Sequence, residues 1–252
     1  MKLCPNNQAG FTLIELAIVL VIIGVLVGSF IGSIGARIDT TRRAEAVSDL
    51  GEIKQAILGY AYSSPGPNLP CPDCSILVGC IGAIGINDGL EDRDASGNCY
   101  TGYGNLPWQT LGLGRSDTWN TRYRYWVDTT FADQTPAFGL GDSANGVIQT
   151  RVPDGLTPPG TVLENVASNA AMVVFSHGKN TYGGISADAA ARPAIPAVDV
   201  DEAENADFDS TFVSREPSDV GALTAGGEFD DILIWLPEYE LKAKMIEAGR
   251  LP

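Results

Sequence analysis

The N-terminal part of the chain carries a long apolar stretch. Residues 16–36 contain no charged side chain, and the apolar positions begin at Phe11. A helix rises 1.5 Å per residue, so about 20 residues cross the hydrocarbon core of a bilayer, which is about 30 Å thick. The stretch is also longer than the apolar region of a secretory signal. Its length therefore predicts a membrane-spanning helix over residues 11–36.

The same helix is predicted to continue beyond the apolar stretch. Apolar residues recur at steps of three and four over residues 47–61, with polar residues between them. This spacing is typical of an amphipathic helix. The Ser-Ser-Pro-Gly-Pro segment at residues 63–67 ends it. We therefore expect an amphipathic extension over residues 37–62, followed by a head formed by residues 63–252.

Strand patterns dominate the head. Residues 119–127 alternate aromatic and polar side chains, residues 171–175 are apolar, and residues 229–235 form a further apolar segment. After Pro237, acids precede bases up to Gly249, which is typical of a short helix. The predicted fold is α+β, with the long N-terminal helix, membrane-spanning in its first half, packed on an antiparallel β-sheet head.

Composition excludes several functions. The chain has 16 Lys and Arg against 31 Asp and Glu, a net charge of −15, and nucleic-acid binding needs a cationic face. His177 is the single histidine, which leaves few ways to build a hydrolytic triad or a His-rich metal site. Ser176 adjoins it, so their side chains would point to opposite faces of a strand. We expect no enzyme, and His177 is interpreted as a structural residue.

Glu15 is the exception within the apolar stretch. A carboxylate near the centre of a membrane-spanning helix costs about 2.5–3.5 kcal/mol, and less near the interface. Two interpretations follow. Glu15 lies at headgroup depth, where its charge is hydrated, or it pairs with a cationic group inside an assembly.

The residues around Glu15 resemble a known signal. Gly-Phe-Thr-Leu-Ile-Glu at residues 10–15 is similar to the N-terminal signal of type IV prepilins and type II secretion pseudopilins. The resemblance implies that a prepilin peptidase removes a leader, residues 1–10, by cutting between Gly10 and Phe11, and methylates the Phe11 amine. It also implies that this amine pairs with Glu15 of a neighbouring subunit in a filament, and that the head is pilin-like.

The resemblance also sets the orientation. Lys2 precedes the apolar stretch, whereas Arg37, Arg42 and Arg43 follow it, so a count of positive charges favours the opposite topology. The signal is more specific than this count. We therefore expect a single-pass inner-membrane protein with the leader in the cytoplasm and the head in the periplasm, and later a filament in the periplasm or at the cell surface.

Three small residues share one face of the apolar stretch. Gly24, Gly28 and Gly32 follow one another at four-residue steps. Such spacing lets helices approach closely in lipid, which would serve assembly. A merely flexible membrane helix explains the same residues, and both interpretations stay open.

The cysteines predict disulfides in the head. Cys4 would leave with the leader, and an even number remains in an oxidising compartment. Two disulfides in any of three connectivities are expected. A zinc site is disfavoured because the gaps lack the paired CxxC pattern, and prolines around the CxxC segment disfavour a redox motif. The four residues concerned are Cys71, Cys74, Cys80 and Cys99.

Two segments of the head are candidates for calcium. One segment, residues 117–125, resembles a strand of major pseudopilins. Another, residues 176–184 followed by Asp230 and Asp231, resembles their calcium-binding C-terminal loop. The resemblance implies calcium at Asp230 and Asp231, across an insertion at residues 185–229. The oxygen-rich residues 87–94 lack EF-hand spacing, so a solvated acidic loop is favoured over calcium there. No cofactor is expected to be required.

These observations predict a structural protein. The chain is interpreted as a filament subunit of a type IV pilus-like structure or a type II secretion pseudopilus, and its bulky head favours a minor subunit. The expected partners are the prepilin peptidase, other pilin or pseudopilin subunits, the inner-membrane assembly platform and the inner membrane. The alternative is a single-span anchored protein whose extracytoplasmic head binds a ligand or acts as an enzyme.

Overall fold

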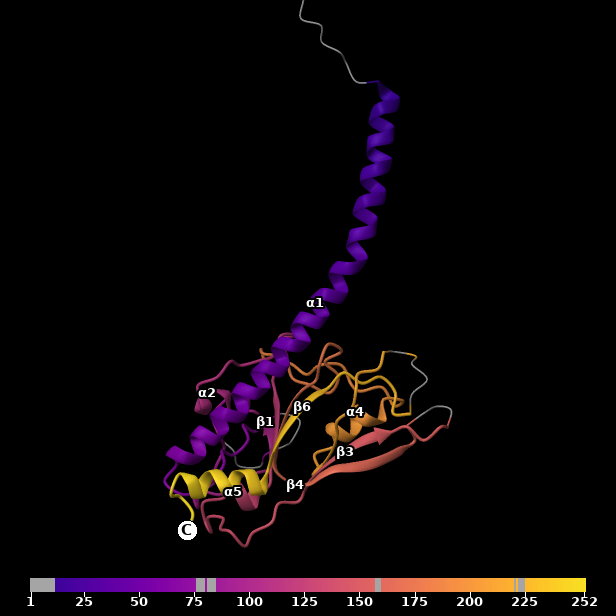
Figure 1. The fold of residues 1–252 in the computed structure, drawn as a ribbon. Coiled ribbons are helices and arrows are strands. Elements are labelled where there is room, and N and C mark those ends of the chain that lie inside the picture. Colours follow the sequence, from indigo (N-terminus) through magenta and orange to yellow (C-terminus); the bar gives the residue numbers. More distant parts are fainter. Residues whose placement is uncertain (1–11, 76–79, 81–84, 157–159, 220, 222–224) are drawn as a thin grey trace, which may run out of the picture. The chain divides into compact units, whose positions relative to one another are not determined.

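The computed structural model describes residues 12–75, 80, 85–156, 160–219, 221 and 225–252, with the side chains of residues 28–34 and 36 left out (Figure 1). The predictions for Gly10 and Phe11, and those for the side-chain face at Gly28 and Gly32, lie outside the described residues. The chain divides into two compact units, Met1–Arg42 and Arg43–Pro252, which are described separately below.

A single long helix, α1 (Leu13–Ser63), opens the fold. It ends where the Pro-Gly-Pro segment begins, because proline disfavours helical conformation in the residue before it. The long N-terminal helix predicted from the sequence is thus confirmed. Within the described part of the chain, however, no helix is both long and apolar enough to span a bilayer, so the membrane-spanning segment predicted over residues 11–36 is not borne out.

The second unit contains the remaining elements. The helices are short, and the strands differ widely in length. They are β1 (Tyr103–Asn105), α2 (Trp108–Leu111), β2 (Arg124–Val127), α3 (Thr129–Ala132), β3 (Gly146–Val152), β4 (Val162–Ser176), α4 (Val200–Asn205), β5 (Thr211–Val213), β6 (Ile232–Pro237) and α5 (Glu238–Glu247).

These strands form one six-stranded sheet in the order β1-β2-β4-β3-β5, with β6 also paired to β4. Most pairs are antiparallel, but β5 runs parallel to β3, with Ile148 opposite Phe212. The prediction of a purely antiparallel sheet is therefore wrong. A parallel pair needs a long connection, and the chain between β3 and β5 supplies it, because it contains β4 and the part of the insertion that includes α4.

The long strand β4 is buried on both faces at its C-terminal end. Met172 and Val174 pack into one core cluster, while Val173 and Phe175 pack into another. Successive side chains of a strand point to opposite faces, so a strand covered on both sides reads as a continuous apolar run. This explains the unbroken apolar segment at residues 171–175.

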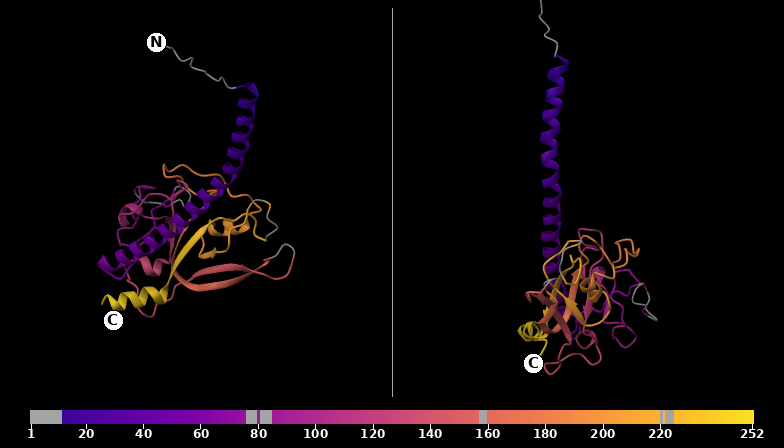
Figure 2. Two further views of the ribbon diagram at one scale, coloured as in Figure 1. Left: turned by 45° about the horizontal axis from the view of Figure 1, so that its top comes forward. Right: turned by 90° about the vertical axis from the view of Figure 1, so that its right-hand side faces the viewer.

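The amphipathic part of α1 covers the larger core cluster. Leu50 and Ile57 are almost fully buried there, together with Tyr125 of β2. The helix α5 lies beside this part of α1 (Figure 2), and the Lys54 ammonium contacts Glu240 of α5 at 2.8 Å. The packing of a long helix on the sheet of the second unit agrees with the expected α+β architecture.

Candidate functional site

The first helix begins with a capping box. The Thr12 amide and hydroxyl donate to Glu15 Oε2 at 2.9 and 2.8 Å, and the Glu15 amide donates back to Thr12 Oγ1 at 3.3 Å. This reciprocal pairing satisfies backbone donors that a helix start otherwise leaves without partners. Glu15 therefore has a local role within its own chain, which the sequence interpretation had not considered.

The apolar residues on either side of Glu15, from Leu13 to Val27, are exposed to solvent. Leu13 is 90 % exposed and Val25 is 69 % exposed. Extended apolar surfaces of this kind mark sites that other proteins or membranes cover. Gly24 has no neighbour within 4 Å of an added Cβ, so the small-residue face is open there. The exposed large side chains of this surface are Leu13, Ile14, Leu16, Ile18, Val19, Leu20, Val21, Ile22, Ile23, Val25, Leu26 and Val27.

The cysteines form two disulfides, which link Cys71 to Cys99 and Cys74 to Cys80. The prediction of disulfides is confirmed, and one of the three connectivities is selected. Arg93 reinforces the same segment, because its guanidinium donates to the backbone carbonyls of Leu69, Gly97 and Ala132. The disulfides and Arg93 therefore hold the loops that contain these cysteines in place.

The C-terminal loop gathers three carboxylates. Glu202 of α4 joins Asp230 and Asp231, and each residue places a carboxylate oxygen within 4.8 Å of the others. We call these three residues the carboxylate cluster. Glu202 and Asp231 are 2 % and 3 % exposed. The predicted pair is thus adjacent in space to a third acid that the sequence interpretation missed.

Hydrogen bonds satisfy only part of the carboxylate cluster. The Asn180 side chain donates to Glu202 Oε1 at 2.7 Å, and the Asn205 side chain donates to Asp231 Oδ2 at 2.8 Å. Glu202 Oε2 and Asp230 Oδ1 are buried and have no hydrogen-bond partner. Converging carboxylate oxygens are the donor set that hard divalent cations such as calcium prefer. The residues present therefore fit calcium in kind.

The electrostatics of the carboxylate cluster are consistent with its burial. Burial raises the pKa of Glu202 to about 7 and that of Asp230 to about 6. It raises the pKa of Asp231 well above its ordinary value. The His177 ring lies 4.0 Å from Asp231, and burial, aided by the charge of Arg124, holds its pKa well below the usual range. A neutral, buried His177 agrees with a structural role.

Ser176 and His177 do not form a nucleophile–base pair. The Ser176 hydroxyl donates to Asp117, and His177 packs edge-on against Phe175. Asp117 also accepts from the amides of Trp119 and Thr121, so it organises a turn. The polar groups around Ser176 thus maintain the fold.

The oxygen-rich loop at residues 87–94 uses its carboxylates internally. Glu91 accepts from the Tyr60 hydroxyl at 2.6 Å, Asp92 accepts from the Cys74 amide at 2.8 Å, and Asp94 accepts from two amides of its own turn. Among the described residues, the acids of this loop do not form a group of three whose carboxylate oxygens converge. The geometry favours a structural loop.

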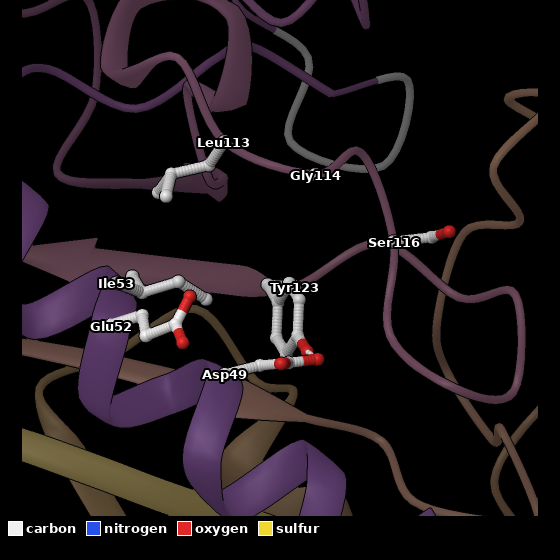
Figure 3. A pocket seen from close by; sticks show the side chains of 7 residues that line it. All are labelled: Asp49, Glu52, Ile53, Leu113, Gly114, Ser116 and Tyr123. Carbon is white, nitrogen blue, oxygen red and sulfur yellow. Dashed lines mark hydrogen bonds between the residues drawn. The ribbon is translucent and has the colours of Figure 1, made fainter.

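A small hollow lies between α1 and the loop before β2 (Figure 3). Its volume is about 120 Å³, well below that of a typical ligand pocket. The Tyr123 hydroxyl donates to Asp49 Oδ2 at 3.1 Å, and burial raises the pKa of that hydroxyl. The hollow does not have the size of a substrate site. It is lined by Asp49, Glu52, Ile53, Leu113, Gly114, Ser116 and Tyr123.

Asp73 is another buried acid, and it lies between Cys71 and Cys74 in the sequence. Burial raises its pKa to about 7, opposed by the Gly89 amide and by Arg122, whose guanidinium lies 3.5 Å away. The folded chain therefore binds the proton of the Asp73 carboxyl group more tightly than the unfolded chain does. The resulting stability is present below pH about 4, the pKa of a free aspartate, and is lost as the pH rises to about 7.

We predict that Asp73→Asn flattens this pH dependence, because asparagine does not titrate. As the pH rises from 4 to 7, the melting temperature of the wild type is expected to fall a few degrees further than that of the variant. This difference corresponds to about 1–2 kcal/mol in the free energy of unfolding. Thermal unfolding at several pH values measures the difference. Asp219→Asn, at an exposed position, is the control. Equal slopes for wild type and Asp73→Asn would contradict the prediction.

Comparison with known proteins identifies the N-terminal segment. Residues 5–31 match the family model of the prokaryotic N-terminal methylation motif. This motif is the prepilin-type cleavage and methylation signal of type IV pilins and pseudopilins, so the resemblance seen in the sequence is confirmed. No curated protein and no solved structure matches the chain.

Proposed function

We propose that this chain is a minor subunit of a type IV pilus-like filament or a type II secretion pseudopilus, matured by a prepilin peptidase between Gly10 and Phe11. One observation carries the proposal. A methylation motif at residues 5–31 includes a helix whose apolar side chains are exposed from Leu13 to Val27. A signal for processing and a surface that needs covering thus coincide in one segment. The bulky head supports a minor position, because large heads crowd a uniform filament.

Burial of the apolar surface supplies the driving force for assembly. Full burial of a Leu, Ile or Val side chain contributes about 1.5–3 kcal/mol. Complete burial of four such residues would therefore contribute about 6–12 kcal/mol, before the entropy of association is subtracted. Other pilin or pseudopilin subunits with the same kind of N-terminal segment would offer a matching surface. Before assembly, the apolar N-terminal segment attaches the chain to the inner membrane, and the head lies in the periplasm. The inner-membrane assembly platform is then a partner.

Glu15 sets the register between neighbouring subunits. In the separate chain, its carboxylate accepts hydrogen bonds from Thr12. In the filament, the methylated Phe11 amine of a neighbour replaces or joins these donors. Such a charge pair is much stronger in a low-dielectric core than in water. Gly24, Gly28 and Gly32 would let the helices approach closely there.

The proposal predicts a defined mature N-terminus. Intact mass and N-terminal peptide mapping of the protein from its native membrane are expected to find a chain that begins at Phe11 and bears one added methyl group. Gly10→Val is expected to leave residues 1–10 in place, because a branched side chain replaces the small residue at the cleavage point. Gly24→Ala is the matched control and should be processed normally. A wild-type chain that retains Met1 would overturn the proposal. So would a chain that begins near Ala36, which cleavage after the small-residue site at residues 33–35 would leave.

The alternative is an anchored protein whose head binds a ligand or acts as an enzyme. One observation favours it, since the capping box gives Glu15 a purpose that needs no second copy. In that case the charge of Glu15 would be dispensable, whereas a filament subunit requires it.

We also propose that the C-terminal loop binds calcium through Asp230 and Asp231. The convergence of acidic oxygens and the unpartnered Asp230 Oδ1 support this proposal. Calcium would neutralise the carboxylates and hold the loop before β6 in one conformation. This stabilising role is independent of filament assembly.

A further inference from the structure

The insertion brings its own acid to the C-terminal loop. Glu202 lies on α4, in the middle of the insertion, and precedes Asp230 by 28 residues. Nevertheless the Asp230 amide donates to Glu202 Oε1 at 3.1 Å. The Asn180 side chain, on the other side of the insertion, donates to the same oxygen. Glu202 is therefore held firmly against the loop.

The arrangement leaves buried carboxylate oxygens without hydrogen-bond partners. Glu202 is 2 % exposed, and its Oε2 atom has no partner. A buried carboxylate oxygen without a partner loses its hydration and gains nothing in return. Because Asp230 Oδ1 is also unpartnered, two of the three converging acids each offer one unused oxygen.

Neighbouring arginines are engaged with other groups. Arg215 binds Asp201 at 2.6 Å and donates to the Gly227 carbonyl at 2.9 Å. Arg43 donates to the backbone carbonyl of Asp230, not to its carboxylate. These bonds leave the free carboxylate oxygens open to another cation.

We propose that Glu202 is a ligand of the same calcium ion as Asp230 and Asp231, so that ion binding fastens the insertion to the sheet. This inference rests on the calcium proposal above and extends it to a residue outside the loop. Three carboxylates supply at least three of the six to eight oxygens that calcium takes, and water and backbone carbonyls can supply the rest. The insertion thus completes the site.

The ion would act together with bonds that already anchor α4. The Asp201 carboxylate forms ion pairs with Arg151 and Arg215. The Asn205 side chain donates to Asp231, and its amide oxygen accepts from the Val213 amide. These contacts position α4 before the ion binds. Calcium would then hold the three acids against one another, and α4 would open less often.

Hydrogen exchange on the full-length chain tests the inference. The protein is stripped with EDTA and compared in calcium chloride and in magnesium chloride at equal ionic strength. Calcium is expected to slow amide exchange in residues 200–206 by about tenfold or more, because an ion that binds only the closed state lowers the open population. Glu202→Gln is expected to lose this protection and to weaken calcium binding by about tenfold, while retaining the Oε1 acceptor that holds the fold.

Two further variants separate the possible outcomes. Glu216→Gln removes an exposed acid from the same insertion and should behave as the wild type. Asp231→Asn should abolish calcium binding. If Asp231→Asn loses calcium but Glu202→Gln binds it with unchanged affinity and protection, this inference is overturned and the calcium proposal survives. If the wild type shows no response to calcium, both are overturned, and the N-terminal evidence for a filament subunit is unaffected.

Discussion

Replacement of Glu15 by glutamine is expected to abolish filament assembly while leaving the start of α1 intact. Glutamine satisfies a capping box as glutamate does, so the bonds between Thr12 and residue 15 can persist. The negative charge, however, is lost. If a neighbour's Phe11 amine must be neutralised in a low-dielectric core, the uncompensated amine costs several kcal/mol per subunit, on the order of a broken buried ion pair. The cost arises at each position that this subunit occupies in the filament.

The measurement is the amount of filament sheared from cells, compared with the amount of mature subunit in the membrane. Thr12→Val is the matched control, because it removes the hydroxyl from the cap and keeps the charge of Glu15. This control is expected to assemble, with a helix start weakened by about 1 kcal/mol. Normal filaments from Glu15→Gln would instead support the anchored-protein alternative, in which Glu15 serves only its own helix.

Loss of the Cys71–Cys99 disulfide is expected to be the most destabilising change in the head. The bond closes 28 residues of chain, whereas Cys74–Cys80 closes 6. The chain-entropy relation gives about 3.6 kcal/mol for the longer loop and about 2.2 kcal/mol for the shorter one. Cys71 and Cys74 are both fully buried, so the cavity left by truncation does not distinguish the two bonds, and loop length decides the order.

Urea unfolding of the two double-alanine variants, followed by tryptophan fluorescence, compares the two bonds directly. Each variant replaces both cysteines of one pair, so no free thiol remains to form a wrong disulfide. The Cys71–Cys99 variant should unfold at the lower urea concentration. A larger loss for the Cys74–Cys80 variant would show that loop closure does not determine the stability of this segment.

Much of the fold could be read from local patterns, because those patterns report burial. The three- and four-residue spacing at residues 47–61 matches the buried stripe of α1, which includes Leu50 and Ile57. The apolar run at residues 171–175 matches the doubly covered end of β4. The first half of β4 was missed because its side chains from Val162 to Val166 are exposed and show no apolar alternation.

The candidate site was less accessible from sequence, because its residues meet only through tertiary contacts. Asp230 and Asp231 were found through a resemblance, but Glu202 belongs to an insertion that no family pattern covers. Its one sequence signal, a group of acids at residues 199–209, is typical of a solvated segment. The capping box was a missed local signal, since Thr12 and Glu15 have the required spacing. The disulfide connectivity could not follow from spacing alone.

The contact between Gly178 and Asp230 has a practical consequence. Gly178 adopts φ +58°, and a Cβ added there would lie 2.2 Å from Asp230 Oδ1 and 2.4 Å from the Asp230 carbonyl oxygen. The chain therefore departs from β4 and returns toward β6 at almost one point. Residues 179–229 thus leave the β4–β6 pair and return to it at closely spaced ends, although β5 within them still pairs with β3 in the sheet. A change of length in this segment, outside α4 and β5, therefore need not realign β4 and β6, because the ends of the segment already meet.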